Sequence, residues 1–303
     1  MKKKILFPIV FICALLAFVL VFFTIRQYQS NQQVAREWQT MPNNAPVLTS
    51  TTHLEIIPLY EAAGNAEQFS IGHGVSYLIR TDSGSVLLDA GFNPENSETV
   101  PFAQNMQTLG ISWEEIQAVL ISHRHPDHVG GMDAWNNHTL NLGDIPSSLP
   151  VYTPVGMKFP GVAVSRDPFL LTTDIATTGA ISYPEVFPLS LLDPKGSEQA
   201  LVIHVAGHGL VLITGCGHPT LEKLVSRAEA LYGESVIGVI GGLHLMNATA
   251  SELQPQIKFL QARQPQWIVL STHDSGPAAL DAFQAAFPHV YQILEVGESI
   301  LIP

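Results

Sequence analysis

The sequence predicts an α/β domain that follows one N-terminal transmembrane helix. From about residue 53 onward, apolar strand-like runs alternate with helix-like segments, as expected for strands buried between helices. Residues 5–25 (ILFPIVFICALLAFVLVFFTI) carry no charge, and a helix needs ~20 apolar residues to cross a bilayer. These two observations give the plan of the molecule, a membrane segment followed by a large globular domain.

The composition argues against nucleic acid as a partner. The 303-residue chain has a formal net charge of −12 and only 14 Lys and Arg residues. Binding to a phosphate backbone depends on clustered Lys and Arg side chains. With 46 % hydrophobic residues, the chain is long and apolar enough for a substantial core. We therefore expect a globular protein that acts on a small-molecule substrate.

The N-terminal segment predicts an uncleaved anchor, with a cleaved signal peptide as the alternative. Residues 1–4 (MKKK) form a basic segment, residues 5–25 the anchor, and residues 26–52 a polar tether rich in Gln, Asn, Ser, Thr and Pro. The apolar run exceeds the ~7–15 residues of a signal-peptide core, and no small-residue cleavage site follows it. Its three preceding lysines outnumber Arg26. The positive-inside rule then predicts a single-pass protein of the cell membrane with its C-terminal domain outside the cytoplasm.

The first third of the domain at 53–303 should be rich in strands. LEIIPLY, SYLIRTD and SVLLDAG are apolar or alternating runs bounded by Gly, Asn and Asp, as is typical of strands joined by turns. WEEIQAVLISH predicts a short helix that leads into a strand. The segment from about 136 to 195, with many Pro, Gly, Ser and Thr residues, shows no clear pattern.

The C-terminal half predicts a regular alternation of strands and helices. The expected strands are LVLITGCGH, VIGVIGGLHL, WIVLSTHDSG and YQILEV. The expected helices between them are TLEKLVSRAEALYG, SELQPQIKFLQARQ and PAALDAFQAAF. Four strand-like runs end in a histidine: His123, His218, His244 and His273. Because α/β folds assemble their sites at the carboxyl ends of strands, we expect these four side chains to meet.

The segment HRHPDH predicts a metal site. In an extended segment His123 and His125 point the same way, and two imidazoles on one side can bind one Zn²⁺ at about 2.0–2.1 Å. Pro126 ends the strand. Asp127 and His128 then lie on a turn, where they can reach a second ion roughly 3.5–4 Å from the first.

The other histidines have weaker claims to a functional role. His53, His138 and His289 have no other candidate ligands near them in the sequence, so we expect them to be ordinary surface residues. His73, His204 and His208 flank glycines near expected strand ends. A pocket role stays open for these three, although a structural role is favoured.

The motif resembles a known family. HRHPDH has the H-x-H-x-D-H form of the metallo-β-lactamase fold superfamily, and SYLIRTDSGSVLLDAG resembles the strand pair that opens that fold. The chain is most similar to the ribofuranosylaminobenzene 5′-phosphate synthase-like (7,8-dihydropterin synthase-like) hydrolases of that superfamily. The resemblance covers about residue 54 to the end. The matching stretches are TTGAI (177–181), EQALVI (198–203), TGCGH (214–218), GGLHL (241–245) and THDSG (272–276).

The resemblance implies an αββα sandwich, two sheets face to face with helices outside, and a metal site at one edge. It would make Asp89, at the end of SVLLDAG, a buried residue that hydrogen-bonds the loop of metal ligands. That role makes independent sense because ligating histidines usually donate their second N–H to a carboxylate or carbonyl. The structural alternative for Asp89 is a turn-forming aspartate before Gly91.

One departure from the family limits what the resemblance implies. Many members place an aspartate that bridges two metals where this chain has TGCGH, which offers Cys216 and His218. Cys216 could bind metal as a thiolate or could be a small buried hydrophobe. The similar subfamily also has a cysteine after the last histidine, where this chain has Asp274, so only His273 is carried over there.

The expected function is zinc-dependent hydrolysis of an ester, phosphoester or lactone-type substrate. One Zn²⁺ would use His123, His125 and His218, and a second, weaker one Asp127, His128 and His273. Zinc lowers the pKa of bound water to about 7 and polarises a substrate oxygen. Asp127 would orient the hydroxide, and His244 would be either a ligand or a hydrogen-bond donor to the oxyanion. A catalytically silent metal-binding surface protein and a redox di-iron member of the fold remain the alternatives.

Overall fold

The computed structural model describes residues 2–186 and 188–303, with side chains from Phe11 onward. The chain divides into two compact units. The smaller unit comprises Met1–Pro42 with Ser182–Gly196, and the larger unit comprises Asn43–Ile181 with Ser197–Pro303.

In the larger unit, the described residues form two seven-stranded sheets. The first runs β1-β11-β12-β13-β14-β15, with β8 beside β11, and the second runs β16-β2-β3-β4-β5-β6-β7. The strands of the first sheet are β1 (Ser50–Thr51), β8 (Ile175–Thr177), β11 (Leu201–Val205), β12 (Gly209–Thr214), β13 (Val236–Gly241), β14 (Trp267–Leu270) and β15 (Tyr291–Ile293). Those of the second are β2 (Leu54–Tyr60), β3 (Ser76–Thr81), β4 (Gly84–Leu88), β5 (Ile116–Leu120), β6 (Val151–Thr153), β7 (Val162–Val164) and β16 (Ile300–Ile302).

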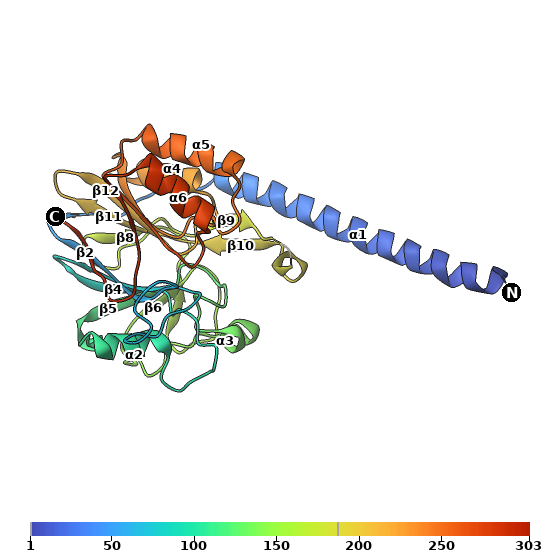
Figure 1. Ribbon diagram of the computed structural model, residues 1–303, viewed down its shortest axis with the longest axis horizontal. Helices are drawn as coiled ribbons and strands as arrows, with labels where there is room; N and C mark the ends of the chain where they lie inside the picture. Colours follow the sequence, from blue (N-terminus) through green and yellow to red (C-terminus); the bar gives the residue numbers. More distant parts are fainter. Residues whose placement is uncertain (1, 187) are drawn as a thin grey trace. The chain divides into compact units, whose positions relative to one another are not determined.

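Helices cover the outer faces of both sheets. Figure 1 shows helices on the outer side of each sheet. They are α4 (Leu221–Tyr232), α5 (Ala250–Gln261) and α6 (Pro277–Ala286) on one side and α2 (Pro101–Thr108) and α3 (Met132–Asn137) on the other. The αββα sandwich expected from the resemblance is confirmed.

Alternation along the strands builds two apolar layers. In β2, Leu54 and Ile56 pack into a cluster shared with strands of the first sheet, whereas Ile57 and Leu59 pack into a second cluster with Phe102 of α2. Successive side chains of a strand point to opposite faces. The second sheet is therefore buried on both faces, which explains why its strands read as continuous apolar runs.

Most of the elements expected from the sequence are present. A short 3-10 helix at Trp113–Glu115 leads into β5, and each strand and helix expected in the C-terminal half is found with slightly shorter bounds. The sequence did not predict α2 and α3, or the short strands within residues 136–195. Strands of three or four residues are too short to show a period of two, which is why that segment has no visible pattern.

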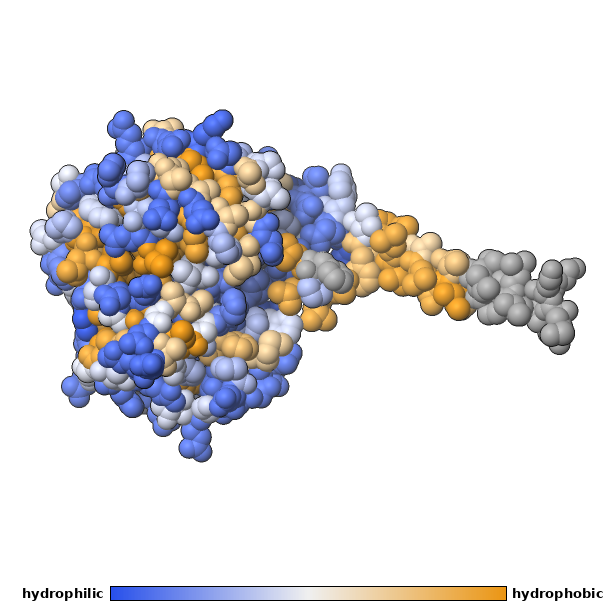
Figure 2. All heavy atoms as spheres, viewed as in Figure 1, coloured by the Kyte–Doolittle hydropathy of each residue, from blue (hydrophilic) through white to orange (hydrophobic). Residues whose placement is uncertain are grey.

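The smaller unit contains a long helix and a hairpin. Helix α1 (Lys2–Gln39) includes a segment, Phe11–Gln39, that is long and apolar enough to cross a membrane. Its described side chains form an exposed apolar surface in Figure 2. The strands β9 (Ile181–Pro184) and β10 (Lys195–Glu198) pair with each other, and the connection between them contains a 3-10 helix, η2 (Leu189–Leu191).

The segment expected as a polar tether, residues 26–52, differs from that expectation. Its first half is helical, because α1 continues to Gln39. Side chains four positions apart support this extension, since Gln27 donates to Asn31 at 3.3 Å and Gln33 donates to Glu37 at 2.8 Å. Its second half belongs to the larger unit, where β1 pairs with β11.

Candidate metal centre

The expected ligands follow the carboxyl ends of strands from both sheets. Asp89 follows β4 and the HRHPDH segment follows β5, whereas Cys216 and His218 follow β12 and His273 follows β14. Strands β4 and β5 are parallel, as are β12, β13 and β14. Parallel strands deliver their carboxyl ends to the same edge of a sheet, where α/β proteins bind ligands.

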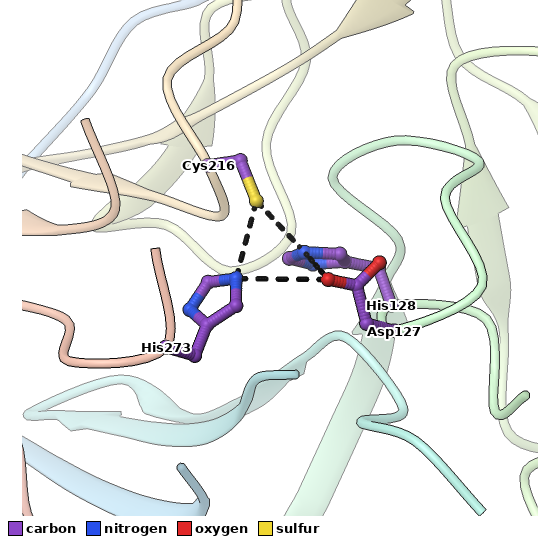
Figure 3. A group of neighbouring side chains, drawn as sticks. All are labelled: Asp127, His128, Cys216 and His273. Carbon is purple, nitrogen blue, oxygen red and sulfur yellow. Dashed lines mark hydrogen bonds and ion pairs between the residues drawn. The ribbon is translucent and has the colours of Figure 1, made fainter. Parts of the chain in front are cut away.

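The first group of candidate ligands consists of Asp127, His128, Cys216 and His273, whose ligand atoms lie within 4.8 Å of one another. Figure 3 shows these four side chains pointing toward one another. The Cys216 Sγ lies 3.0 Å from His128 Nε2 and 3.3 Å from His273 Nε2. The Asp127 Oδ2 lies 3.8 Å from each of these two nitrogens. One oxygen, one sulfur and two nitrogens thus surround a common point, a donor set that suits zinc.

The second group consists of His123, Cys216 and His218 and shares its sulfur with the first. The ring of His125 lies 4.6 Å from the ring of His123 and 4.6 Å from that of His218, measured between centroids. The ligand nitrogens of His125 are not within the tight group, although its ring borders it. Cys216 therefore occupies the central position between two neighbouring sets of ligands.

Asp89 and Ser122 fix the tautomers of two histidines. Asp89 accepts hydrogen bonds from the Ser122 backbone N–H and hydroxyl, both at 2.6 Å, and lies 2.7 Å from His128 Nδ1. The single hydroxyl proton of Ser122 is donated to Asp89, so the 2.9 Å contact between Ser122 Oγ and His123 Nδ1 is donated by the ring N–H. When their rings are neutral, His123 and His128 therefore each keep a lone pair on Nε2, which can bind a metal ion. Asp89 thus hydrogen-bonds both Ser122 and His128.

A second carboxylate–serine–histidine arrangement lies beside His273, and the sequence did not predict it. Glu61, fully buried just after β2, accepts hydrogen bonds from Tyr77 Oη at 2.7 Å and Ser271 Oγ at 2.6 Å. Because the Ser271 proton is donated to Glu61, the 2.6 Å contact with His273 Nδ1 is donated by the imidazole. The His273 Nε2 is then the atom that faces Cys216 and Asp127.

Burial keeps three of the imidazoles neutral. It lowers the pKa of His123 and of His218 well below the usual value, and neighbouring imidazoles lower both pKa values further. Burial, followed by the charge of His128, lowers the pKa of His273 to about 3. Neutral imidazole is the form that binds metal, so these three rings are in the form that binds an ion.

Charges act differently on His128, Asp127 and Cys216. Burial alone would lower the pKa of His128, but Asp89 and Asp127 outweigh it and raise this pKa to about 9. Burial opposes ionisation of Asp127, but His128 and His273 hold its pKa below the usual value. Burial and nearby carboxylates raise the pKa of the Cys216 thiol well above its usual value. A metal bound here would therefore displace protons from His128 and Cys216.

Two buried carboxylates brace the loops that carry the ligands. Glu198 accepts hydrogen bonds from the backbone N–H groups of Cys216, Gly217 and His218 at 2.8–3.0 Å. Asp274 accepts one from the backbone N–H of His244 at 2.8 Å. His244 has a positive φ of 56° and an exposed side chain, and its ring lies 4.4 Å from that of His218. It is thus the exposed histidine beside the buried ligands.

His73, for which a structural role was favoured, lies at the site. Its Nδ1 is 3.2 Å from the carbonyl oxygen of His273. The neighbouring Gly74 has a φ of +129°, and a Cβ there would approach the carbonyl oxygen of Asp127 to 2.5 Å. The loop that carries His73 is therefore pressed against the HRHPDH loop. A glycine-flanked histidine near a strand end was the only signal of this in the sequence.

The other histidines lie outside this cluster, as expected. His53 and His289 are exposed. The remaining three contact other side chains: His204 with Glu234 at 3.1 Å, His208 with Gln266 at 2.7 Å and His138 with Arg124 at 2.9 Å.

The residues present fit a metal ion. The Nε2 of His123 is buried and has no hydrogen-bond partner within the described part of the chain. A buried polar atom without a partner is unfavourable, and its position beside the Cys216 thiol explains it as a ligand atom. Both groups offer nitrogen and sulfur donors, and the first group adds the Asp127 carboxylate, all of which zinc accepts.

Comparison with known proteins decides the family. The sequence model of the Metallo-beta-lactamase superfamily matches residues 70–221. The chain belongs to this superfamily. A curated relative, the 7,8-dihydropterin-6-methyl-4-(beta-D-ribofuranosyl)-aminobenzene-5′-phosphate synthase of Methanocaldococcus jannaschii, is 26% identical over 285 residues, covering 78% of this chain and 92% of its own.

Solved structures of the metallo-β-lactamase superfamily share the fold. A metal-dependent hydrolase of the beta-lactamase superfamily aligns with a TM-score of 0.60 at 22% identity, covering 82% of this chain and 99% of its own. The metallo-beta-lactamase fold protein YhfI from Bacillus subtilis aligns with a TM-score of 0.53 at 13% identity, covering 83% and 100%. At these identities the likeness concerns the fold alone.

Proposed function

We propose that the protein is a zinc-dependent hydrolase with two adjacent metal sites. The observation that carries the proposal is the meeting of two ligand groups at Cys216, with the histidine tautomers set by Asp89 and Glu61. The first site would use His123, His125 and His218 and the second Asp127, His128 and His273, with Cys216 between them. The sulfur takes the place that a carboxylate would otherwise fill.

The remaining chemistry belongs to the side chains around the site. When bound, zinc supplies an acidified water and polarises a carbonyl or phosphoryl oxygen of the substrate. Asp127, whose side chain is 30% exposed, would orient that water toward the substrate. His244, exposed beside His218, would donate a hydrogen bond to the substrate oxygen that gains negative charge. Esters, phosphoesters and lactones are the substrate classes that need these groups.

The proposal includes the cellular position of the enzyme. The apolar segment of α1 would serve as an uncleaved single-pass anchor, with the lysines of residues 2–4 in the cytoplasm and the domain outside it. The full-length protein should then fractionate with membranes, and its domain should be cut by protease added from outside. A natural mature form that begins near residues 25–37 would contradict the anchor and support a signal peptide.

Metal content of purified variants tests the site. His123→Ala, His218→Ala and His273→Ala should each lose metal and activity, because each removes a buried ligand nitrogen. His204→Ala and His208→Ala are matched controls that should keep both, since these rings contact Glu234 and Gln266 instead. If the controls lose metal while His218→Ala keeps it, the ligand set is wrong.

His244→Ala separates the two roles open to that residue. As a hydrogen-bond donor it should retain the full metal content and lose roughly 10²–10³ in kcat on the best substrate of an ester, phosphodiester and lactone panel. A loss of metal would instead make it a ligand. Elemental analysis combined with kinetics on the same preparation distinguishes these outcomes.

A further inference from the structure

The smaller unit carries an apolar hairpin end that has no role in the proposed hydrolase site. We define the hairpin tip as Val186 together with residues 188–192 (PLSLL), none of which is charged. Three of its large apolar side chains are exposed, namely Val186 (52%), Leu191 (37%) and Leu192 (70%). So much exposed apolar surface on so short a segment needs a partner.

The tip is held at a defined level along α1. The Arg26 guanidinium donates to the carbonyl oxygens of Leu191 at 2.7 Å and Leu192 at 2.8 Å. Arg26 directly follows Ile25, the last residue of the uncharged run 5–25. The tip therefore lies where the apolar part of the helix ends.

The rest of the hairpin runs along the polar part of the same helix. Ser30 donates to the carbonyl oxygen of Pro194 at 2.7 Å, and Lys195 Nζ pairs with Glu37 Oε1 at 2.8 Å. These contacts place the hairpin base beside the later turns of α1 and its tip toward the membrane segment. Figure 1 shows β9 and β10 beside this end of the helix.

The helix residues at the level of the tip are typical of a bilayer surface. Ile25 and Tyr28 are 51% and 64% exposed, and tyrosine and arginine are common where a membrane helix leaves the lipid. A hollow of about 520 Å³ lies between the helix and the tip, lined among others by Phe23, Tyr28 and Leu191. Leu191 and Leu192 stay exposed despite their backbone contacts with Arg26, and acyl chains could fill the hollow.

We infer that the hairpin tip inserts into the outer surface layer of the phospholipid bilayer beside α1, as a second membrane contact. The bilayer is the partner that we propose for the tip, because Arg26 holds the tip directly beside the end of the apolar segment of the helix. Residues 182–196 are covalently inserted between β8 and β11 of the larger unit. The catalytic domain would thus be attached to the membrane through both ends of this insertion as well as through α1.

Spin-label accessibility of the full-length protein in phosphatidylcholine liposomes tests the insertion. A nitroxide is attached to Leu192→Cys in a Cys13→Ser background, in which the other cysteine, Cys216, is buried at 4% exposure. Leu301→Cys, 61% exposed in β16, is the matched control. The ratio of collisions with oxygen to collisions with a water-soluble nickel chelate should be several-fold higher at Leu192 than at Leu301.

A label at Leu20→Cys, a position 69% exposed in α1, tests the membrane anchor separately from the insertion of the tip. An oxygen-rich label at Leu20 together with equal ratios at Leu192 and Leu301 overturns the tip insertion alone. A water-exposed label at Leu20 overturns the anchor and, with it, the insertion. Shielding of the Leu192 label from both quenchers means that protein covers the tip, which also overturns the inference. Metal content of each labelled variant checks that the domain is folded.

Discussion

At the scale of single residues, two serines perform the same task on opposite sides of the metal centre. Ser122 links Asp89 to His123, and Ser271 links Glu61 to His273. Each serine gives its proton to a buried carboxylate and accepts one from an imidazole. The carboxylates thus set the tautomers of His123 and His273 through a hydroxyl, whereas Asp89 contacts the ring of His128 directly.

Removal of either hydroxyl should therefore weaken metal binding without disrupting the fold. We expect Ser122→Ala and Ser271→Ala each to lower zinc affinity by about 10–100-fold, the usual effect of losing a hydrogen bond to a ligand. Ser85→Ala, a buried serine at the opposite end of β4 from Asp89, is the control and should bind normally. Competition with a chromophoric chelator measures the affinities, and unchanged affinity in Ser271→Ala would remove the assigned role of Glu61.

Cys216 offers a second prediction, because its sulfur belongs to both ligand groups. Cys216→Ala should reduce the bound zinc from two ions to one, since the two sites lose their shared donor. Cys216→Asp supplies a carboxylate at the same place and should keep two. Metal-to-protein ratios after dialysis test this. Two ions in Cys216→Ala would mean that the thiol is merely a buried neighbour.

The candidate ligands of the HRHPDH motif could be predicted from the sequence, whereas the residues that hydrogen-bond the ligands from distant parts of the chain could not. His123, His125, Asp127 and His128 fall within one short motif whose spacing alone indicates metal binding. Glu61 meets Ser271 across 210 positions of sequence, so only the folded chain shows that they touch. His73 was assigned a structural role for the same reason.

At the scale of elements, the strands could be located from their apolar runs, but their exact ends could not. The runs were expected to stop at His218, His244 and His273, whereas the strands end at Thr214, Gly241 and Leu270 and the histidines lie on the loops that follow. The short helix α3 was missed because it has only Met132–Asn137, fewer residues than two helical turns need to show a period. The continuation of α1 to Gln39 was missed because polar side chains there contact the hairpin, which the sequence cannot reveal.

The start of α5 makes a pH-dependent prediction. Glu252 accepts hydrogen bonds from the backbone N–H and the hydroxyl of Thr249 at 2.8 and 2.7 Å, and these bonds lower its pKa below 4.5. A carboxylate with a depressed folded pKa stabilises the protein above its unfolded pKa, and this contribution is lost as the pH falls through the folded value. Wild type should therefore be more stable than Glu252→Gln at pH 6, with the difference shrinking toward pH 3.

Urea unfolding of the two proteins at each pH measures that difference. Other carboxylates titrate over the same range, but they do so in both proteins and cancel in the comparison. A constant difference between wild type and Glu252→Gln from pH 6 to pH 3 would show that the charge of Glu252 is not what supports this helix end.

At the scale of the whole molecule, the sandwich followed from the resemblance and the alternating apolar runs, but the boundaries of the units did not. Strand β1 joins the larger unit by pairing Ser50 and Thr51 with His204 and Val205 of β11. Such a two-residue parallel pairing leaves no periodic signal. The larger unit begins at Asn43, ahead of the residue 53 at which the sequence suggested that the domain starts.

The origin of the ligands in both sheets has a consequence for stability. His123 to His128 follow β5 of the second sheet, whereas Cys216 and His273 follow strands of the first. An ion held by both sets fastens the sheets together only in the native state. By mass action, free metal at 100 times its Kd then raises the free energy of unfolding by about 2.7 kcal/mol.

Chelation should accordingly shift the urea midpoint of wild type downward and leave that of His123→Ala nearly unchanged, as followed by circular dichroism. Equal shifts in both proteins would contradict the linkage. Since a bound ion would hold the seam between the sheets closed, the lifetime of this protein in the cell would depend on the local supply of that metal. Chains that fold where the metal is scarce would open along that seam first and present their inner apolar faces to proteases.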